Sequence, residues 1–540
     1  MHTTTATSAP GAATRRYLAA MRNRGPLSID WAAAPTRHKR YPGAERARLP
    51  WAAGDGSVLG LIGELLRDLL GMTRLVWSHH LDDRGEPQGR PPLLLTGRPA
   101  PSGGGLYPIE AYVAAGEPHL PAALYHYNPV HHELERVRGG DHVPALTGLL
   151  VDGPVADMAV VLSAVFWRSM FKYGDFGYRL ICQETGVLVA QALAVGGRLG
   201  LAGRACLRFP DGEVDRLLGL DGAREAALAV LTFTLPHARA GEPPASSRAG
   251  ELMSQPAAGE STPLPRAMPD GPAAALHRAC TSASLGPSTS PDGGSRDEAG
   301  SPELTGALRP RLPAWAGRAV PAPEPAAGAW PAAGVPRRTS PLAGYRPVPL
   351  MEGALGGVLV AAGGGYPADL PGAATGPAAT ALCLLSLRVE GLPRGAYWYD
   401  PARHTLHELA GAGQVDAVAT GRLLANTRVA LRGAAAALVP VGDPVAGAHL
   451  FGDRWYRMQQ MEAGLVAQRA ALAAAALGLA TRIHSDGANE TTDEVLGLVG
   501  TPLRSLSFLA MGTPPTGGPL VARPMPVLVR GEVMPTPATA

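Results

Sequence analysis

The sequence predicts an α+β fold that occurs twice in one chain, and three observations carry this prediction. Similar motifs recur in the same order in both parts of the chain, a Pro-rich stretch separates them, and each part runs from paired strands through a long apolar helix to a final strand. Strands that neither alternate strictly with helices nor occur without them are typical of α+β proteins. At 540 residues the chain has room for two ordinary domains, each large enough to bury a core.

The recurring motifs indicate an internal duplication. "ALYHYNPVHHELERV" from residue 123 matches "GAYWYDPARHTLHEL" from residue 395, an offset of 272 residues. "GYRLICQETG" from residue 177 matches "WYRMQQMEAG" from residue 455, an offset of 278 that also aligns "LGLAGR" with "LGLATR" and "DRLLGL" with "DEVLGL". Several matches in one order at nearly one offset are typical of a repeated structural unit.

Each predicted element follows from residue type and period. The strands "EAYVAAG" and "ALYHYNP" in the first half, and "LCLLSLRVEG" and "GAYWYDP" in the second, are rich in strand formers and close at turn signals. The stretch 178–201, "YRLICQETGVLVAQALAVGGRLGL", repeats apolar residues at helical spacing around most of its girth, which predicts a buried helix. "ALAVLTFTL" and "SLSFLAMG" predict a last strand in each half.

Composition divides the chain into four parts. Residues 237–336 hold 17 of the 53 prolines and no Ile, Phe or Tyr. Such a stretch cannot bury enough apolar surface to offset its ordering entropy, so it is predicted to be a disordered linker. On either side of it we predict domains at 26–236 and 337–530, and before the first domain a flexible tail at 1–25.

Charge and cysteine content exclude several functions. A net charge of +3 without a basic run between aromatic residues argues against nucleic-acid binding. The four cysteines lie far apart, with neither a CxxC motif nor zinc-type histidine spacing, so we expect no metal site, no disulfide framework and free thiols in a reducing compartment. The N-terminus lacks the apolar core of a signal peptide, and "AALAAAALGLA" is too short to span a bilayer, which predicts a soluble cytoplasmic protein.

Lysine is so rare in this chain that its two occurrences are informative. Of the 48 basic residues only Lys39 and Lys172 are lysines, so a solvated cation is almost always arginine here. Lys172 lies in "FKYGDFGYR", directly before Tyr173, and the 278 offset aligns this pair with Leu450 and Phe451. An ionisable pair is therefore kept in one half and replaced by apolar residues in the other.

Taken together, these motifs resemble the SagB-type azoline dehydrogenases, a branch of the nitroreductase-like FMN flavoproteins. The resemblance is dense in the first half, which carries "RYPGAERARLP", "LLRDLLGMTR", "GRPAPSGGGLYPIEAYV", "LYHYNPVHHELE", "FKYGDFGYR", "GRLGLAG" and "DRLLGL". It is weaker in the second half, where "GGGYP" (363–367) lacks the Pro-Ser that precedes "GGG" in the first. It implies two nitroreductase-like domains, each a central antiparallel-rich sheet flanked by helices, fused as an intrachain pseudo-dimer.

The resemblance also implies a function. The protein would be an FMN-dependent dehydrogenase that oxidises thiazoline or oxazoline rings to thiazoles or oxazoles in a ribosomally made, post-translationally modified peptide. Its partners would be the azoline-containing precursor peptide and the cyclodehydratase that makes the rings. Two other functions stay open: a general NAD(P)H-dependent nitroreductase or flavin reductase, and a non-catalytic flavin-binding scaffold of a biosynthetic complex.

Lys172 and Tyr173 match the Lys-Tyr pair of this family. Burial or a neighbouring cation can lower the pKa of a lysine toward neutrality, whereas arginine stays protonated and is a poor base. Lys172 is therefore the candidate base for the ring proton, while the flavin supplies the redox chemistry. Tyr173 would relay the proton or, as a phenolate beside a cation, act as the base itself. The alternative is an ordinary surface lysine beside a core tyrosine.

The glycine-rich loop in "RPAPSGGG" is the candidate flavin loop of the first half. Glycines let backbone N–H groups approach a ring or an anion closely, and a serine hydroxyl can bond the flavin edge. A GGG run alone is a weak signal in a chain with 68 glycines. The residues that the resemblance assigns to the cofactor here are Pro101, Ser102, Gly103, Gly104 and Gly105. Arg98, just upstream, is a further candidate that could pair with the phosphate or with the peptide, and a plain surface arginine is the alternative.

A phosphate clamp is expected from the second half. "PRRTSP" resembles the Arg-Arg-x-Ser start of the nitroreductases and points to Arg337, Arg338 and Ser340, because guanidinium groups bind phosphate bidentately. A basic linker end is the alternative. We therefore expect one composite FMN site, with the clamp from one half and the loop from the other. The reciprocal site, with "TRHKRYP" and "GGGYP", is expected to be degenerate.

Several other polar residues are expected to have no part in the chemistry. His131 and His132 fall in the turn of a predicted hairpin, where solvated side chains are the rule. Glu184 and Glu462 lie at matching positions of the two long helices, where helix-surface or interhelix pairs are expected. Arg168 and Arg179 flank the Lys-Tyr pair; they could steer a peptide carbonyl or the flavin, but a role outside the chemistry is favoured.

Overall fold

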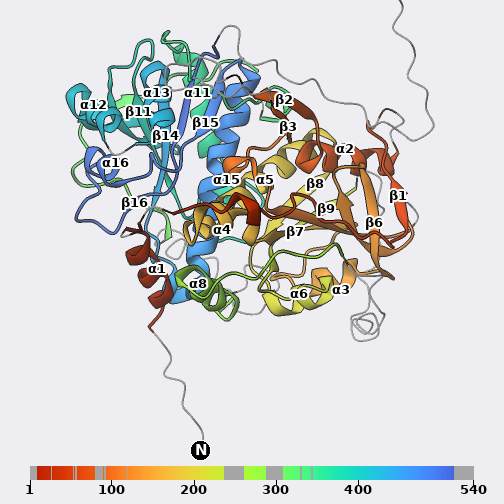
Figure 1. Cartoon of the computed structure of the whole chain (residues 1–540). Coiled ribbons are helices and arrows are strands. Elements are labelled where there is room, and N and C mark those ends of the chain that lie inside the picture. Colours follow the sequence, from red (N-terminus) through yellow and green to blue (C-terminus); the bar gives the residue numbers. More distant parts are fainter. Residues whose placement is uncertain are drawn as a thin grey trace, which may run out of the picture.

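The computed structural model describes two sheets that lie on opposite sides of a central pair of helices (Figure 1). The described residues are 9–235, 261–287 and 308–515, apart from gaps at 23, 26, 53, 55–56, 79–88, 90–92, 118–119, 329–330, 342–343 and 422. The predicted α+β class is confirmed. One hydrophobic core runs through both halves around the central helices, and each sheet has a smaller core on its outer face.

The first half builds a seven-stranded antiparallel sheet in the order β1-β6-β5-β4-β7-β9-β8. Its strands are β1 (Arg46–Arg48), β4 (Ile109–Ala115), β5 (Ala123–Asn128), β6 (Glu133–Gly139), β7 (Met158–Val165), β8 (Ala202–Cys206) and β9 (Glu225–Thr234). A separate hairpin pairs β2 (Arg74–Ser78) with β3 (Leu93–Gly97). The central strands β4 and β7 are buried along their whole length, which explains why they lack a clear polar face in the sequence.

The second half repeats this sheet. Its order is β10-β13-β12-β11-β14-β17-β15, with the short β16 also paired to β14. Each strand stands where its sequence counterpart stands in the first sheet, so the duplication holds at the level of topology. The strands are β10 (Ala319–Pro321), β11 (Ala381–Ser386), β12 (Gly395–Asp400), β13 (Thr405–Gly411), β14 (Ala436–Gly442), β15 (Ala480–Ile483), β16 (Arg504–Ser505) and β17 (Leu509–Gly512).

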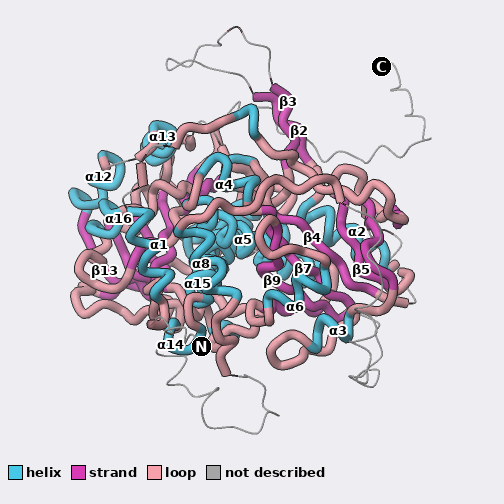
Figure 2. The backbone as a smooth tube through the Cα atoms, turned by 60° about the horizontal axis from the view of Figure 1, so that its bottom comes forward, coloured by secondary structure: helices cyan, strands magenta, loops and turns pink. Residues whose placement is uncertain are grey.

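Helices cover the sheets and separate them (Figure 2). Those of the first half are α1 (Ala12–Arg22), α2 (Val58–Leu70), α3 (Val143–Gly148), α4 (Trp167–Tyr173), α5 (Phe176–Arg198) and α6 (Asp211–Leu218). Those that follow are α8 (Pro272–Thr281), α10 (Pro331–Gly334), α11 (Glu352–Gly363), α12 (Ala412–Thr420), α13 (Ala425–Gly433), α14 (Ala448–Phe451), α15 (Arg454–Ala476) and α16 (Glu490–Val495).

The helices α5 and α15 cross so closely that only glycine fits at the crossing. A Cβ on Gly186 of α5 would lie 1.7 Å from the carbonyl oxygen of Met461, and a Cβ on Gly464 of α15 would lie 1.9 Å from that of Gln183. The 278 offset maps one of these contacts onto the other. The two halves are therefore related by a pseudo-two-fold axis through this crossing, as the predicted pseudo-dimer requires.

Helix α5 is long and apolar enough to cross a bilayer. This corrects the expectation that the chain has no apolar run of that length. However, 83% of its most apolar stretch is buried inside the molecule, much of it against α15. A buried core helix of this length can be as apolar as a membrane-spanning helix. The apolar surface of α5 is therefore explained by its burial in the protein interior.

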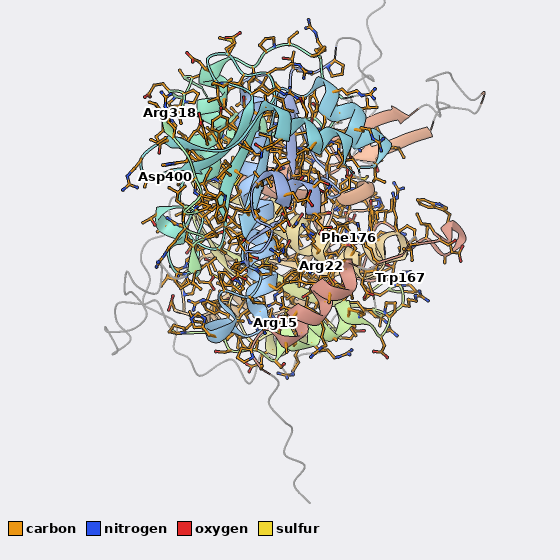
Figure 3. All side chains as sticks on the ribbon, turned by 90° about the vertical axis from the view of Figure 1, so that its left-hand side faces the viewer. Arg15, Arg22, Trp167, Phe176, Arg318 and Asp400 are labelled. Carbon is orange, nitrogen blue, oxygen red and sulfur yellow. The ribbon has the colours of Figure 1, made fainter. Side chains whose placement is uncertain are left out.

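The predicted flexible tail 1–25 contains an ordered helix, α1, with Arg15 toward its start and Arg22 at its end (Figure 3). Tyr17 anchors this helix and is fully buried. Its ring packs edge-on against the rings of Tyr178 and Tyr456, at centroid distances of 6.4 and 5.4 Å. A single tyrosine in a polar-looking segment was too small a signal to show this docking in the sequence.

The predicted linker 237–336 is packed in part, which corrects the expectation of disorder for its described residues. Helix α8 buries Leu276 and Cys280, and lies beside α1 (Figure 2). Further along, β10 pairs with β13 of the second sheet. The segment lacks apolar residues on average, but those it has fall on one face of α8, and its backbone completes a sheet edge. Residues 236–260 and 288–307 lie outside the described residues.

Candidate functional site

Helix α4 carries Lys172 and Tyr173 in its last turn and ends at Gly174, whose φ of 54° stops the helix. Both side chains meet the glycine loop. A Cβ on Gly104 would lie 2.6 Å from Tyr173 Oη and 3.0 Å from Lys172 Nζ. With a φ of 65° as well, position 104 favours glycine on both counts. The structure thus brings together the loop and the ionisable pair that the sequence singled out separately.

The environments of Lys172 and Tyr173 move their pKa values in opposite directions. Partial burial, and then the nearby Arg37, lower the pKa of Lys172, whose Nζ lies 5.6 Å from the ring centroid of Trp31. Burial, and then the carboxyl of Glu184, raise the pKa of Tyr173. The lysine is biased toward the neutral amine and the tyrosine toward the protonated phenol, a separation typical of an assigned base and acid.

A residue of the second half also acts on this pair. Arg482 on β15 opposes the rise in the Tyr173 pKa through its positive charge. Sequence reasoning missed Arg482 as a site residue, although the repeated "LGLAGR" and "LGLATR" end in arginine in both halves. A single sequence does not show that Arg482 of one half lies near Tyr173 of the other. The role of Arg482 could therefore be recognised only once the two halves were seen packed together.

The hydroxyl of Ser102 is engaged inside the protein rather than free toward a ligand. It donates to Glu184 Oε2 over 2.8 Å and accepts the backbone N–H of Tyr107, also over 2.8 Å. The N–H of Gly103 donates to the same carboxylate oxygen over 3.2 Å. The expectation that Glu184 makes a helix-surface or interhelix pair is wrong, because its partners are the loop. Pro101 leads into this loop, and the η2 turn (Gly103–Gly105) completes it.

Arg98 is the most conspicuous unpaired cation in the described part of the chain. Its side chain is 3% exposed, yet none of its three guanidinium nitrogens has a hydrogen-bond partner among the described residues. The guanidinium lies 4.7 Å from the ring centroid of Tyr107. A buried charge without a partner is costly, so this arrangement fits a site that binds an anion.

Arg338 reaches the loop region of the first half from the second half. Its Nε donates to the carbonyl of Pro99 over 2.9 Å, beside the loop of the first half, and its Nη1 donates to Ser340 Oγ over 2.8 Å. Burial, and then the positive charge of Arg74, lower the pKa of Arg338 to about 9. Cations that disfavour one another in this way would gain from a shared anion.

Arg337 does not reach this loop region. Its guanidinium donates to the carbonyl of Ala476 at the end of α15, and the side chain is exposed. Of the predicted clamp, Arg338 and Ser340 therefore contact each other and Arg338 alone contacts the first-half loop region, whereas Arg337 binds a helix end.

No protein-family model matches the chain. It is 32% identical over 146 residues to the microcin B17-processing protein McbC of Escherichia coli, a match that covers 25% of this chain and 53% of McbC. It is 31% identical over 137 residues to the trifolitoxin-processing protein TfxB of Rhizobium leguminosarum bv. trifolii, covering 24% of this chain and 37% of TfxB. The matches thus span about half or less of these relatives' lengths.

A solved structure resembles nearly the whole chain. The crystal structure of a nitroreductase-type protein from Anabaena variabilis aligns with a TM-score of 0.68 at 22% identity, covering 93% of this chain and 99% of that one. The chain is homologous to McbC and TfxB, and its fold is nitroreductase-like. The predicted fold class is thereby confirmed.

The second nitroreductase-like half has a different loop from the one expected. "GGGYP" lies at the end of α11, where a Cβ on Gly365 would lie 2.0 Å from the carbonyl oxygen of Ala374. The segment that precedes β11, as the flavin-loop candidate precedes β4, is instead η4 (Ala373–Thr375) and the residues after it. The expectation that placed "GGGYP" opposite "PSGGG" is wrong, because the repeat offset differs between these segments.

The place of the Lys-Tyr pair in the second half is filled by protein. Phe451, the counterpart of Tyr173, is fully buried and stacks on Trp455 at a centroid distance of 6.1 Å. A Cβ on Gly286, in the segment after α8, would lie 2.3 Å from the Phe451 ring, and the Arg208 guanidinium lies 5.9 Å from the ring centroid. The segment after α8 thus covers this position.

A buried polar network supports only the first half. Arg168 pairs with Glu110 and donates to the carbonyls of Thr36 and Tyr107, so it holds the N-terminal segment and the loop rather than facing a substrate. His126 continues the network from Glu110 to Glu135. By strand register the second half has Ala381 and Trp398 where the first has Glu110 and His126.

The two histidines of the hairpin turn differ. His131 is exposed, as expected, but His132 is buried, which corrects the expectation of a solvated side chain. Its Nδ1 lies 2.9 Å from Tyr127 Oη, and its Nε2 lies 3.0 Å from the carbonyl oxygen of Pro50. His404 repeats this arrangement in the second half, so the pair is a structural feature of the repeat.

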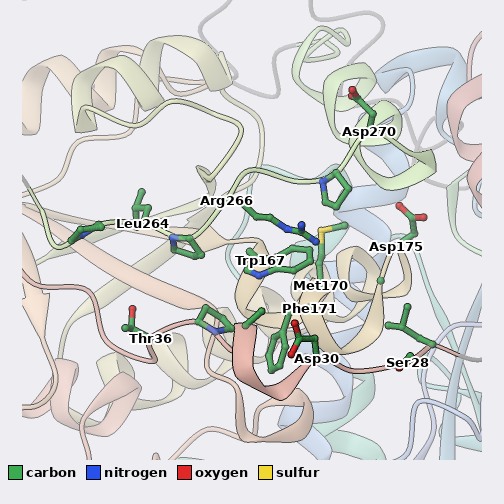
Figure 4. Close-up of a pocket in the computed structure, with 17 residues that line it drawn as sticks. Ser28, Asp30, Thr36, Trp167, Met170, Phe171, Asp175, Leu264, Arg266 and Asp270 are labelled. Carbon is green, nitrogen blue, oxygen red and sulfur yellow. The ribbon is translucent and has the colours of Figure 1, made fainter.

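A cleft of about 660 Å³ lies beside α4 (Figure 4). Trp167, Met170 and Phe171 of α4 form one wall, and residues 27–36 and 263–270 form the others. The guanidinium of Arg266 stacks 3.7 Å from the ring centroid of Trp167. One wall of the cleft therefore comes from the predicted linker, directly beside the helix that carries Lys172.

Proposed function

We propose that this chain is an FMN-dependent dehydrogenase that oxidises thiazoline or oxazoline rings to thiazoles or oxazoles in a ribosomally made peptide. The observation that carries the proposal is the contact of Lys172 and Tyr173 with the Gly104 loop, which follows a buried arginine, Arg98, whose guanidinium has no hydrogen-bond partner among the described residues. The relatives support it, since both are named as processing proteins of a microcin and a trifolitoxin.

The residues present fit a flavin phosphate. The unpartnered guanidinium of Arg98 and the electrostatically disfavoured one of Arg338 would hold it, with Ser340 orienting Arg338. The backbone of Gly103 to Gly105 would approach the ring system. FMN bound there would supply the hydride acceptor for the oxidation.

Lys172 is proposed as the base and Tyr173 as its protonated partner. Azoline oxidation removes a proton and a hydride from the ring. The neutral amine of Lys172 would accept the proton at Nζ, because burial and Arg37 lower its pKa. Tyr173 would remain a phenol that donates a hydrogen bond, because burial and Glu184 raise its pKa. Molecular oxygen would reoxidise the enzyme between turnovers.

A single FMN is proposed for each chain. The first-half site combines Lys172 and the glycine loop with Arg338 of the second half. At the reciprocal place, apolar residues and the segment after α8 fill the space around Phe451. The composite site expected from the sequence is thus retained in the proposal, with the second half as its structural partner.

The azoline-containing precursor peptide and the cyclodehydratase of the same pathway are proposed as partners, and a cytoplasmic location fits them. The ring to be oxidised belongs to a longer chain, so residues on either side of it need room. The cleft lies beside α4, the helix that carries Lys172. It is lined by Trp167, Met170 and Phe171 rather than by Lys172 or Tyr173, so it is a candidate for the flanking peptide and not for the ring itself. Its volume is within the range of ordinary ligand-binding clefts.

The direct test is to reconstitute the purified protein with FMN and incubate it with an azoline-bearing peptide. Loss of two hydrogens per ring, measured by mass spectrometry, is the expected result. Lys172→Ala should keep the flavin and lose this activity. A protein with no affinity for FMN would refute the proposal, and a flavin-loaded Lys172→Ala that oxidises rings at the wild-type rate would favour a scaffold role instead.

A general nitroreductase or flavin reductase is the second candidate, favoured by the fold shared with the Anabaena variabilis protein. NADPH should bleach the bound flavin rapidly in that case, and small nitroaromatic compounds should be turned over. Slow bleaching by NADPH together with fast oxidation of azoline peptides would support the first candidate.

A further inference from the structure

Two glutamates at matching places hold matching loops. Glu184 on α5 and Glu462 on α15 are related by the 278 offset, and both are buried. Glu184 accepts from Ser102 and Gly103, in the loop before β4. Glu462 accepts the backbone N–H groups of Ala378 and Ala379, in the loop before β11, over 2.6 and 2.7 Å. The carboxylate therefore does the same work in both halves.

Burial at these positions disfavours the charged form of each carboxyl group. Burial raises the pKa of Glu184 to about 7, and burial likewise raises the pKa of Glu462. Neither has a cationic side chain within ion-pair distance among the described residues, so donors in the loops are what hold each one. A buried carboxyl without an ion pair is costly to ionise, but removing it would leave the loop donors that it accepts from buried and unpaired.

The first-half loop needs such a hold. Gly104 and Gly105 have φ values of 65° and 67°, and Tyr107 has a φ of 49°, which is unfavourable for a residue with a side chain. Residues in sparsely populated conformations persist only where their surroundings over-determine them. The hydroxyl of Ser102, fixed by Glu184, accepts the N–H of Tyr107 and so helps to fix it.

The contacts of this loop continue to Arg98, the proposed anion-binding residue. Tyr107 Oη accepts the backbone N–H of Arg98 over 3.1 Å, and the Arg98 guanidinium stacks on the Tyr107 ring. A connected path therefore leads from Glu184 through Ser102 and Tyr107 to the unpartnered guanidinium of Arg98. The same loop carries Gly104 against Lys172 and Tyr173.

We infer that Glu184 is a positioning residue for the flavin site: it latches the Ser102–Tyr107 loop so that the glycines face Tyr173 and Arg98 faces the anion. Glu462 makes the equivalent latch in the half without a site, where no ligand depends on it. This inference rests on the proposed function, because it assigns the latched loop to FMN.

The test compares Glu184→Ala, Glu184→Gln and Glu462→Ala by FMN fluorescence titration, thermal melting and turnover of an azoline peptide. Hydrogen bonds to charged groups are strong enough that Glu184→Ala should weaken FMN binding about tenfold or more and lower turnover. Glu184→Gln should stay within about threefold of wild type, because the amide oxygen still accepts. Glu462→Ala should melt at a lower temperature yet bind FMN as wild type does.

Three outcomes would overturn the inference: wild-type FMN affinity in Glu184→Ala, an equal loss of affinity in Glu462→Ala, or no rescue by glutamine. If Glu184→Ala does not fold, Ser102→Ala interrupts the same path and should also weaken FMN binding. A wild-type protein that binds no FMN would refute the proposed function itself. If the wild type binds FMN and Glu184→Ala binds it with the same affinity, only the proposed role of Glu184 would be refuted.

Discussion

The two lysines of this arginine-rich chain lie in opposite environments. Lys39 is 2% exposed, and its ammonium lies 2.6 Å from Glu225 Oε2 and 2.5 Å from Tyr112 Oη. The nearby Glu225 helps to raise its pKa despite burial. Lys172 is only partly buried, has no carboxylate partner in the described structure and has a lowered pKa. At position 172 a lysine can lose its charge, whereas an arginine would stay protonated.

Lys39→Met should destabilise the fold, because Glu225 would then keep a buried charge without its cation. Removing one partner of a buried pair costs about 3–5 kcal/mol, to be measured as the free energy of unfolding in urea at pH 7. Arg40→Met at the neighbouring exposed position is the matched control and should change little. A loss of less than about 1 kcal/mol in Lys39→Met would show that the pair is not a structural anchor.

Arg37→Ala should shift the pH dependence of turnover. The pKa of Lys172 is lowered by burial and then by Arg37, so removing this cation should raise it. If the neutral amine is the active form, activity appears as pH rises through that pKa, and the variant should need a higher pH to reach half its maximal kcat/KM. Arg40→Ala serves as the control. A profile that stays in place, or moves to lower pH, would contradict the role of Lys172 as base.

At the scale of elements, the crossing of α5 and α15 depends on two glycines. Gly186→Ala or Gly464→Ala would put a methyl group within 2 Å of a backbone carbonyl of the other helix, which cannot move aside as a side chain could. Overpacking of this kind costs about 1–3 kcal/mol or more, measurable as a lower melting temperature.

Gly197→Ala is the matched control for these variants. Gly197 is exposed near the end of α5, and nothing lies within 4 Å of the place of its Cβ. In a helix interior, alanine is favoured over glycine by about 0.5–1 kcal/mol, so this variant should melt at a slightly higher temperature. Equal destabilisation by Gly186→Ala and Gly197→Ala would mean that the crossing is looser than described.

Local patterns predicted the elements that carry many apolar residues. The helix expected over 178–201 is found as α5, Phe176–Arg198, and the strand pairs are found where expected. The helices α1 and α8 were missed, since their docking rests on few apolar residues, such as Tyr17 and Leu276, whose partners lie far away in sequence. Composition averaged over a long stretch cannot show a short amphipathic face.

In the candidate site, too, only the residues marked by a local motif were predicted. The Lys172–Tyr173 pair and the glycine loop each have a local motif, and the structure brings them together. Arg482 was missed because it reaches the site from the other half, and Glu184 was misassigned because its partners in the loop lie 81 and 82 residues away in the sequence. Contacts between halves are set by tertiary packing, to which a local sequence window carries no signal.

At the scale of the molecule, the two halves exchange their first helices. The N–H of Thr14 in α1 donates to Asp453, at the start of α15 in the second half. The N–H of Ala273 in α8 donates to Asp175, at the start of α5 in the first half. These aspartates are related by the 278 offset, so the exchange is reciprocal. It makes α8 the counterpart of α1 and joins the halves into one folding unit.

The exchange also explains why the second site should not be recoverable by restoring its lost side chains. The double variant Leu450→Lys, Phe451→Tyr recreates the ionisable pair in α14, but the segment after α8 lies against this position through Gly286, and Arg208 faces it. We expect the variant to bind a single FMN per chain, as wild type does, measured as the ratio of flavin absorbance to protein. The first-half double variant Lys172→Leu, Tyr173→Phe should also retain its FMN but lose turnover, because Arg98, Arg338 and the glycine loop remain. A second FMN in the α14 variant would mean that the covering segment yields to a ligand, and that the side chains alone separate the silent half from the active one.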